Sequence, residues 1–230
     1  MKMILLAICV MLLGTLAAQD STTIFIDAGR NVSEVLVPAR IYQLPKFVEG
    51  TILYRDGTFS KGMLNHNFLN GEIEFINPKN DTLAIAKNQM LNIKQVSMDK
   101  QTFFYDHGYM ELVAKTALGK LTKKQMFVVT KREKIGGYNQ PSSTSAIESY
   151  GSFTDNYGNF FDNLKIKENI TLTLKSYYFI SDGYNVFLPA SKKNMMDLYH
   201  SKRNAIAAYL KKTQVNFKNG EDLKKMFESL

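Results

Sequence analysis

The sequence predicts an α+β fold, in which a curled, mainly antiparallel β-sheet or partial barrel precedes a C-terminal helical segment. Short runs rich in branched and aromatic residues recur through residues 22–188, and tight-turn dipeptides separate these runs. In residues 191–230, apolar side chains instead recur at the spacing of one helix face. The strand-like runs separated by turns indicate the sheet, and the helical spacing of apolar residues indicates the helices.

The sheet is organised around Thr51–Asn77, which contains Asp56-Gly57 and Asn70-Gly71, dipeptides preferred in hairpin turns. The longest expected strand, Thr58–Phe68, has Phe59 and Met63 at odd positions, whereas its later apolar residues, Leu64 and Phe68, are at even positions. Because side chains alternate along a strand, this change predicts a bulge or coil at Gly62 that bends the sheet.

Two-residue turns at these dipeptides would also set the strand register. They place Phe59 opposite Tyr54 and Phe68 opposite Ile73. Further strands are expected at Thr22–Ile26, Thr82–Ala86, Ile93–Met98, Thr102–Tyr105, Tyr109–Val113, Leu118–Ile135, Ile170–Lys175, Tyr177–Ile180 and Asn185–Leu188. Pro38 and Pro45 confine any strand in residues 34–53 to an edge or a loop.

Three helices are expected at the C-terminal end. Ser191, Ser201 and Asn219 each precede an apolar-periodic run and are residues that favour helix N-caps. In the third helix, Glu221 and Asp222 lie in the first turn, where acidic groups are favoured by the helix dipole.

The first residues have the pattern of a secretory signal peptide. A lysine precedes the apolar run Ile4–Leu13, and small residues lead to Ala18, after which cleavage is expected. The run is shorter than a membrane-spanning helix, so no transmembrane segment is expected after cleavage. The single cysteine, Cys9, lies inside this leader, and the mature chain therefore has no disulfide. The expected organisation is a signal peptide (1–18), a mainly β domain (19–190) and C-terminal helices (191–230), exported to the periplasm or cell envelope, or outside the cell.

The formal net charge is +8, and it is concentrated in residues 115–134 and 191–230. An exported chain is not expected to bind nucleic acid, so an acidic envelope protein, an anionic surface polymer or lipid head groups are the expected partners. In an unbroken strand, Lys124, Arg132 and Lys134 would share one face and form a basic stripe. A solvated face that only aids solubility is the alternative.

Residues 136–169 form a long loop in this interpretation, rich in Gly, Ser, Asn and aromatic residues. This composition is typical of contact surfaces, because rigid rings provide area and small polar groups provide hydrogen bonds. The candidate partner-binding residues are Tyr138, Asn139, Tyr150, Phe153 and Tyr157. The alternative is a surface loop whose rings pack on their own sheet.

Signatures of catalysis are absent from the sequence. It has no Gly-x-Ser-x-Gly elbow, no glycine-rich phosphate loop and no His-Glu-x-x-His helix. His66 lies among apolar strand residues and is expected to be a packed side chain, and His107 in a turn is expected to be exposed. Glu72 and Glu74 share a strand face beside a turn and are expected to be solvated. We therefore expect no catalytic residue, cofactor or metal site, and no enzymatic activity.

Several segments resemble a set of uncharacterised exported proteins of Gram-negative bacteria. They are LYRDGTFSKGMLNHNFLNGEIEFI, KLTKKQMFVVTKREK followed by PSSTSAI, and the tail from YYFISDGYNVFLPASKKNMMDLY to IAAYLKKTQVNFKNGEDLKKMF. The likeness runs over roughly residues 48–230. The resemblance implies a periplasmic or envelope location and carries no site residues with it.

The function expected from the sequence is that of an exported, non-enzymatic binding or interaction module of the cell envelope. The alternative is a carrier of a small apolar ligand, with its pocket inside the curled sheet. A carrier would contain an apolar cavity of a few hundred cubic ångströms, whereas an interaction module would expose an aromatic or basic patch.

Overall fold

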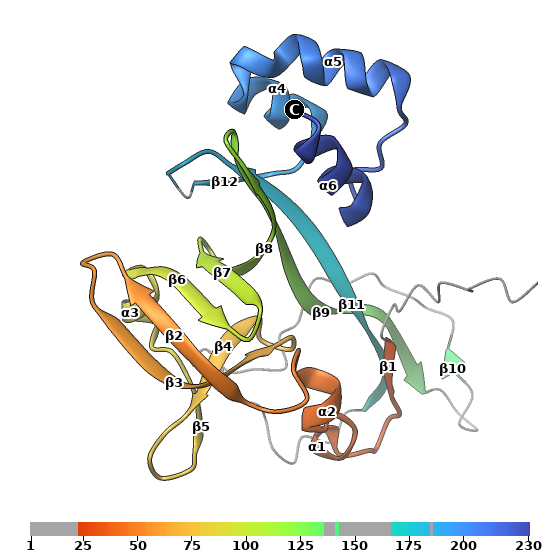
Figure 1. Cartoon of the computed structure of the whole chain (residues 1–230). Coiled ribbons are helices and arrows are strands. Elements are labelled where there is room, and N and C mark those ends of the chain that lie inside the picture. Colours follow the sequence, from red (N-terminus) through yellow and green to blue (C-terminus); the bar gives the residue numbers. More distant parts are fainter. Residues whose placement is uncertain (1–22, 136–140, 143–166, 185) are drawn as a thin grey trace, which may run out of the picture.

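The computed structural model describes residues 23–135, 141–142, 167–184 and 186–230 of the chain (Figure 1). Its strands are β1 (Thr23–Ile26), β2 (Val48–Tyr54), β3 (Phe59–Asn67), β4 (Glu72–Ile76), β5 (Thr82–Ala84), β6 (Ile93–Met98), β7 (Gln101–Tyr105), β8 (Tyr109–Thr116), β9 (Gly119–Ile135), β10 (Pro141–Ser142), β11 (Glu168–Ser181) and β12 (Phe187–Pro189). Its helices are α1 (Val32–Val35), α2 (Pro38–Ile41), α3 (Lys87–Met90), α4 (Lys192–Leu198), α5 (Arg203–Lys212) and α6 (Gly220–Glu228), with a 3-10 turn, η2 (His200–Lys202), between α4 and α5.

The strands form one antiparallel sheet that is curled but not closed. The strand order is β1-β11-β9-β8-β7-β6-β2-β3-β4-β5, with β10 added beside β9 and β12 beside β11. The strands at the two ends of this order, β1 and β5, do not pair with each other. The predicted fold class, a curled antiparallel sheet with C-terminal helices, is therefore confirmed.

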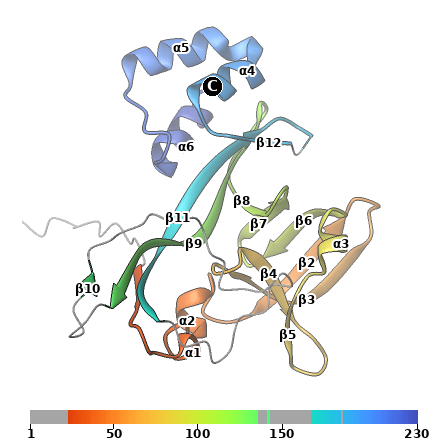
Figure 2. The same ribbon diagram turned by 180° about the vertical axis from the view of Figure 1, so that it is seen from behind.

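Strands β9 and β11 form a long two-stranded spine that joins two separate cores (Figures 1 and 2). Near β1, the spine contributes Phe127, Ile170 and Leu172 to a core shared with α1. At the other end, its Leu121 and Ile180 pack against α4, α5 and α6. A third core fills the curl of the remaining strands and consists of Ile52, Leu64, Ile73, Ile85, Met90, Ile93, Val96, Met98, Phe103 and Tyr109.

The bend predicted at Gly62 is not a bulge, and this prediction is wrong. Strand β3 pairs with β2 in unbroken register through Gly62, which lies opposite Gly50. Phe59 and Met63 do not lie on a buried face of β3, because they are 63% and 39% exposed. The unbroken register keeps the even positions on one face, where Leu64 and His66 are buried and Ser60, near the hairpin tip, is exposed. The register shifts lie elsewhere, in the ladders between β2 and β6, β8 and β9, and β9 and β11.

The predicted hairpin registers are also wrong, although both turns exist. Phe59 pairs with Leu53, and Ile73 pairs with His66. Both connections are therefore longer than two residues. Gly57 and Gly71 adopt positive φ values of 89° and 70°, which explains why glycine occupies these turns.

A short segment, Ile41–Leu44, pairs with the end of β3 through an antiparallel bridge between Tyr42 and Asn67, and we call it the strap. The Ile41 carbonyl accepts from the Phe68 amide at 2.8 Å, and the Gln43 amide donates to the His66 carbonyl at 2.9 Å. The Asn65 side chain bonds both the amide and the carbonyl of Leu44, at 3.1 and 2.9 Å. The strap explains how Asn65, only 1% exposed, can be buried without an apolar environment.

The C-terminal helices pack on the ends of β8, β9 and β11. The Ser191 hydroxyl accepts from the Asn194 amide at 3.1 Å, and Asn219 caps α6 by accepting from two backbone amides, so both predicted caps are confirmed. Ser201 is not a cap, because it lies within η2 and α5 begins at Arg203 without a side-chain cap.

Two further details of the predicted elements need correction. The strands expected at Ile170–Lys175 and Tyr177–Ile180 are one continuous strand, β11. The region expected to be an edge strand or loop around Pro38 contains the short helices α1 and α2, with Pro38 at the first position of α2, where its missing amide costs nothing. Within the described residues, none of the helices combines the length and apolar character needed to cross a membrane.

Candidate functional site

Glu74 is the centre of a buried polar network that fastens the strap to the β3–β4 hairpin. Its side chain is 7% exposed and accepts hydrogen bonds from the Tyr42 hydroxyl and from the side-chain amides of Asn67 and Asn70, the latter two at 3.0 and 2.9 Å. Burial, and then the bond to Glu74, raises the pKa of Tyr42 above its ordinary value. The expectation that Glu74 is solvated is therefore wrong, because the strap covers it.

His66 belongs to a second chain of buried polar groups beneath the strap. Its Nδ1 lies 2.9 Å from Gln43 Oε1, and Gln43 Nε2 donates to Glu111 at 2.8 Å, which in turn pairs with Lys123 at 3.2 Å. Because Gln43 Oε1 can only accept, the His66 proton is on Nδ1. Burial lowers the pKa of His66 to about 4, so the ring is neutral at pH 7. The rings of Phe68 and Phe103 contact it at 5.2 and 5.4 Å, which confirms the prediction of a packed histidine.

Glu72 interacts electrostatically with Tyr109 and Lys124. Glu72 Oε2 and the Tyr109 hydroxyl are buried and have no hydrogen-bond partner among the described residues. Burial raises the pKa of Glu72 to about 6, although the charges of Lys87 and Lys124 oppose this. Burial and the Glu72 charge also raise the pKa of Tyr109. Lys124 is held in place by a bond from its Nζ to the His107 carbonyl at 2.9 Å.

The raised pKa of Glu72 predicts a specific pH dependence of stability. The folded-state pKa of about 6 exceeds the ordinary value of 4.5, so the ionised carboxylate destabilises the fold above pH 6 and has no such effect below pH 4.5. Glu72→Gln is therefore expected to stabilise the protein by about 1 kcal/mol near pH 8 and by little near pH 4.5, since partial exposure reduces the ceiling of about 2 kcal/mol. Urea unfolding at both pH values measures this. The exposed Glu49→Gln is the control, and an equal gain at both pH values would contradict the assignment.

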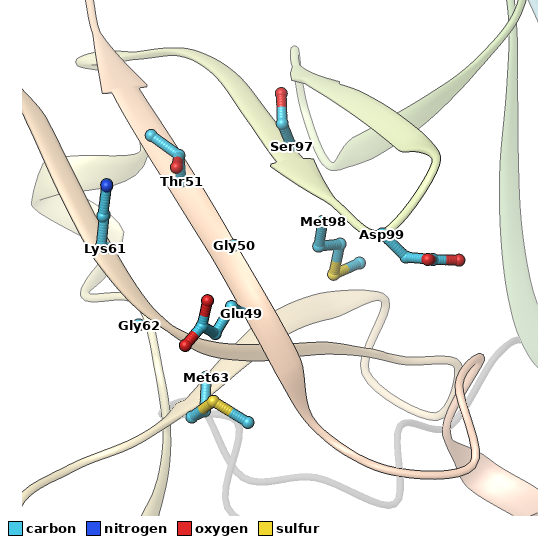
Figure 3. A pocket seen from close by; sticks show the side chains of 9 residues that line it. All are labelled: Glu49, Gly50, Thr51, Lys61, Gly62, Met63, Ser97, Met98 and Asp99. Carbon is cyan, nitrogen blue, oxygen red and sulfur yellow. The ribbon is translucent and has the colours of Figure 1, made fainter.

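An open hollow of about 600 Å³ lies on the outer side of β2, β3 and β6, and we call it the hairpin hollow (Figure 3). Its lining consists of Glu49, Gly50, Thr51, Lys61, Gly62, Met63, Ser97, Met98 and Asp99. The paired Gly50 and Gly62 contribute no side chains to its floor. A methyl group on Gly50 would meet Leu64 Cδ1 at 2.6 Å, so glycine also permits the close packing of β2 over the core. The hollow combines carboxylates, an ammonium group, hydroxyls and thioethers.

A second hollow, of about 640 Å³, lies at the tip of the β2–β3 hairpin beside α3, and we call it the tip hollow. Its lining consists of Tyr54, Arg55, Asp56, Thr58, Gln89 and Asn92. The described residues that line the two hollows include no histidine and no cysteine. Glu72, Tyr109 and His66, whose pKa values are shifted by burial, line neither of these two hollows.

The structure separates the predicted basic residues. Lys124 pairs with Tyr177 of β11, Arg132 with Ile170 and Lys134 with Glu168. Partners in an antiparallel ladder share a face, and β11 alternates regularly between these positions. Lys124 therefore faces away from Arg132 and Lys134, because the register shift at Thr171/Leu172 reverses the alternation of β9. The expectation of one shared face is wrong.

Several of the basic residues in β9 are also engaged with neighbours. Lys131 pairs with Glu133 at 2.7 Å, and Arg132 lies 3.9 Å from Glu168. Together with the bonds of Lys123 and Lys124, these contacts indicate that part of the positive charge is satisfied within the protein. The candidate residues Tyr138, Asn139, Tyr150, Phe153 and Tyr157 lie outside the described residues, as does the expected signal peptide.

Sequence reasoning missed both hollows and the strap network. The exposure of Met63 had no signal in the sequence, since an apolar residue in a strand normally indicates a buried position. His107 is exposed as predicted, with a side chain that is 97% accessible. No group of three or more acidic, histidine or cysteine side chains suited to a metal ion occurs in the part of the chain that the structure describes.

Comparison of the chain with protein-family models, curated proteins and solved structures gave no match.

Proposed function

We propose that this chain is an exported, non-enzymatic binding protein of the cell envelope, and that it engages a protein partner through the hairpin hollow. The hollow carries the proposal because it is an accessible concave surface with exposed apolar residues at its border. Met63 is 39% exposed within it, and Phe59, four residues earlier on the same face of β3, is 63% exposed. Lys61 lies between them, and Glu49 and Asp99 provide the opposite charge.

The distribution of polarised groups supports binding over catalysis. A general acid or base must reach the proton that it transfers. Glu72 and His66 have shifted pKa values, but His66 is 2% exposed and bonded to Gln43, and neither residue lines the hairpin hollow or the tip hollow. Export rests on the leader pattern of residues 1–18, and the periplasm or cell envelope is the proposed location.

The packing inside the curl favours surface binding over the carrier alternative. A carrier needs an apolar cavity, yet Leu64, Ile73, Val96 and Phe103 fill the curl and are each at most 1% exposed. An apolar ligand of ordinary size would have to displace these side chains, at the cost of the packing that stabilises the sheet.

The experiment is capture from envelope extract by the immobilised chain without residues 1–18, at low and high salt, followed by titration of the purified partner. Met63→Glu is expected to weaken partner binding at least tenfold, because it puts a charge where the partner covers an apolar side chain. Tyr184→Glu is the matched control, since Tyr184 is 85% exposed and does not line the hollow. Equal binding by the Met63→Glu variant and the unmodified chain would refute the use of this surface.

A further inference from the structure

The tip hollow is built differently from the hairpin hollow, because polar side chains with free hydrogen-bonding groups line it. Arg55 is fixed by two bonds, from its amide to the Asn92 carbonyl at 2.8 Å and from its Nε to the Leu91 carbonyl at 2.9 Å. The two terminal nitrogens of its guanidinium group have no partner among the described residues. The Arg55 guanidinium group is therefore held at Nε, and its two terminal nitrogens are available to a ligand.

Asp56 is also oriented within the hollow. Its Oδ1 accepts from the amide and the hydroxyl of Thr58, at 2.8 and 2.7 Å. These bonds lower the pKa of Asp56 and keep the carboxylate ionised, while its Oδ2 has no partner within the described chain. The side-chain amides of Gln89 and Asn92 line the same hollow and likewise form no hydrogen bond to any described residue.

The balance of these groups identifies the ligand class. The charges of Arg55 and Asp56 cancel, so the hollow as a whole attracts neither an anion nor a cation strongly. Guanidinium, carboxylate and amide groups are planar, and each presents two polar atoms that can bond two neighbouring hydroxyls at once. The partly buried Tyr54 adds an aromatic ring, which can cover the apolar C–H side of a ligand. A ligand with adjacent hydroxyl groups and no net charge satisfies both the donors and the acceptors.

We propose that the tip hollow binds a sugar unit of an uncharged polysaccharide. Its volume of about 640 Å³ lies within the range of small-molecule sites, roughly 300–1,000 Å³. This site is independent of the proposed protein partner, because the hairpin hollow and the tip hollow share no lining residue. Either proposal can therefore fail without the other.

The experiment is a titration of the purified chain with maltohexaose, cellohexaose and chitohexaose, followed by isothermal calorimetry and amide chemical shifts. At least one of them is expected to bind with a Kd of about 1 mM or tighter, with shifts at the tip of the β2–β3 hairpin. Gln89→Ala and Asn92→Ala are each expected to weaken binding tenfold or more. Both side chains are exposed and have no hydrogen bond to a described residue, so these variants should keep the melting temperature of the unmodified chain. Asn204→Ala, on the exposed side of α5, is the matched control and should bind normally.

Arg55→Lys separates a sugar site from an anion site. A lysine keeps the charge and loses the fork, so sugar binding should fall tenfold or more, whereas an anion site would retain its affinity. The proposal is overturned if none of the three oligosaccharides binds at about 10 mM, ten times the expected Kd. It is also overturned if inorganic phosphate displaces the bound sugar, or if the Gln89→Ala and Asn92→Ala variants bind as tightly as the unmodified chain.

Discussion

Glu74→Ala is expected to reduce the free energy of unfolding by about 3–5 kcal/mol. The substitution removes the acceptor of three hydrogen bonds, from Tyr42, Asn67 and Asn70. Asn67 is 6% exposed, so water cannot readily replace the lost bond, and an unsatisfied buried donor costs about 1–3 kcal/mol. Urea unfolding measures the loss. Hydrogen exchange should show the strap, Ile41–Leu44, opening before the rest of the sheet.

Glu74→Gln is the matched control for this prediction. Its amide oxygen can still accept from Asn67 and Asn70, and its amide nitrogen can donate to the Tyr42 hydroxyl, which can also accept. We expect a loss of about 1 kcal/mol, because neutral hydrogen bonds replace charge-assisted ones. If Glu74→Ala costs no more than Glu74→Gln, the network does not hold the strap on the sheet.

The strands and turns were predictable because their signals are local. Gly57 and Gly71 adopt positive φ values, which few other residue types adopt, so glycine at these positions indicates the turns. The cap at Asn219 is equally local, since one side chain accepts from amides two and three residues later. The hairpin registers were not predictable from the same dipeptides, because side-chain bonds of Asp56 and Asn70 to nearby amides lengthen the turns.

The error at Gly62 shows why burial is harder to predict than strand position. Alternation indicates which residues share a face, but not which face another segment covers. Here Phe59 and Met63 remain exposed, whereas Asn65 on the same face is buried because the strap lies over it. Leu44 of the strap lies 21 positions before Asn65 in the sequence. No local pattern encodes such a contact.

The prediction of a basic stripe on β9 was wrong for a related reason. A single register shift between β9 and β11 places Lys124 on the opposite face from Arg132 and Lys134, and nothing in the residue types of β9 marks the position of this shift. The two hollows were equally unpredictable, since each combines residues of the β2–β3 hairpin with a later segment of the chain. The preference for binding over catalysis stays a prediction from the sequence.

Gly119→Ala is expected to destabilise the protein by about 3 kcal/mol or more, because no room exists for a side chain where the spine meets the helices. Gly119 has a φ of 152°, and a methyl group there would lie 1.9 Å from the carbonyl oxygen of Ser181. That oxygen cannot move freely, since it accepts a buried hydrogen bond from the Tyr199 hydroxyl at 3.0 Å. Tyr199 in turn packs on Phe227 of α6, with ring centroids 6.0 Å apart.

The clash should therefore loosen the attachment of all three C-terminal helices to the sheet. We expect urea unfolding to show the loss of stability, and hydrogen exchange to show faster exchange in α4 and α6 than in β2 and β3. Gly183→Ala is the matched control, because Gly183 lies just beyond the same end of β11 and a methyl group there meets no atom within 4 Å. Its effect should stay within about 0.5 kcal/mol. Equal stability of the two variants would mean that the end of β11 can shift away from β9, and that the bond between Tyr199 and Ser181 does not fix the helices to the spine.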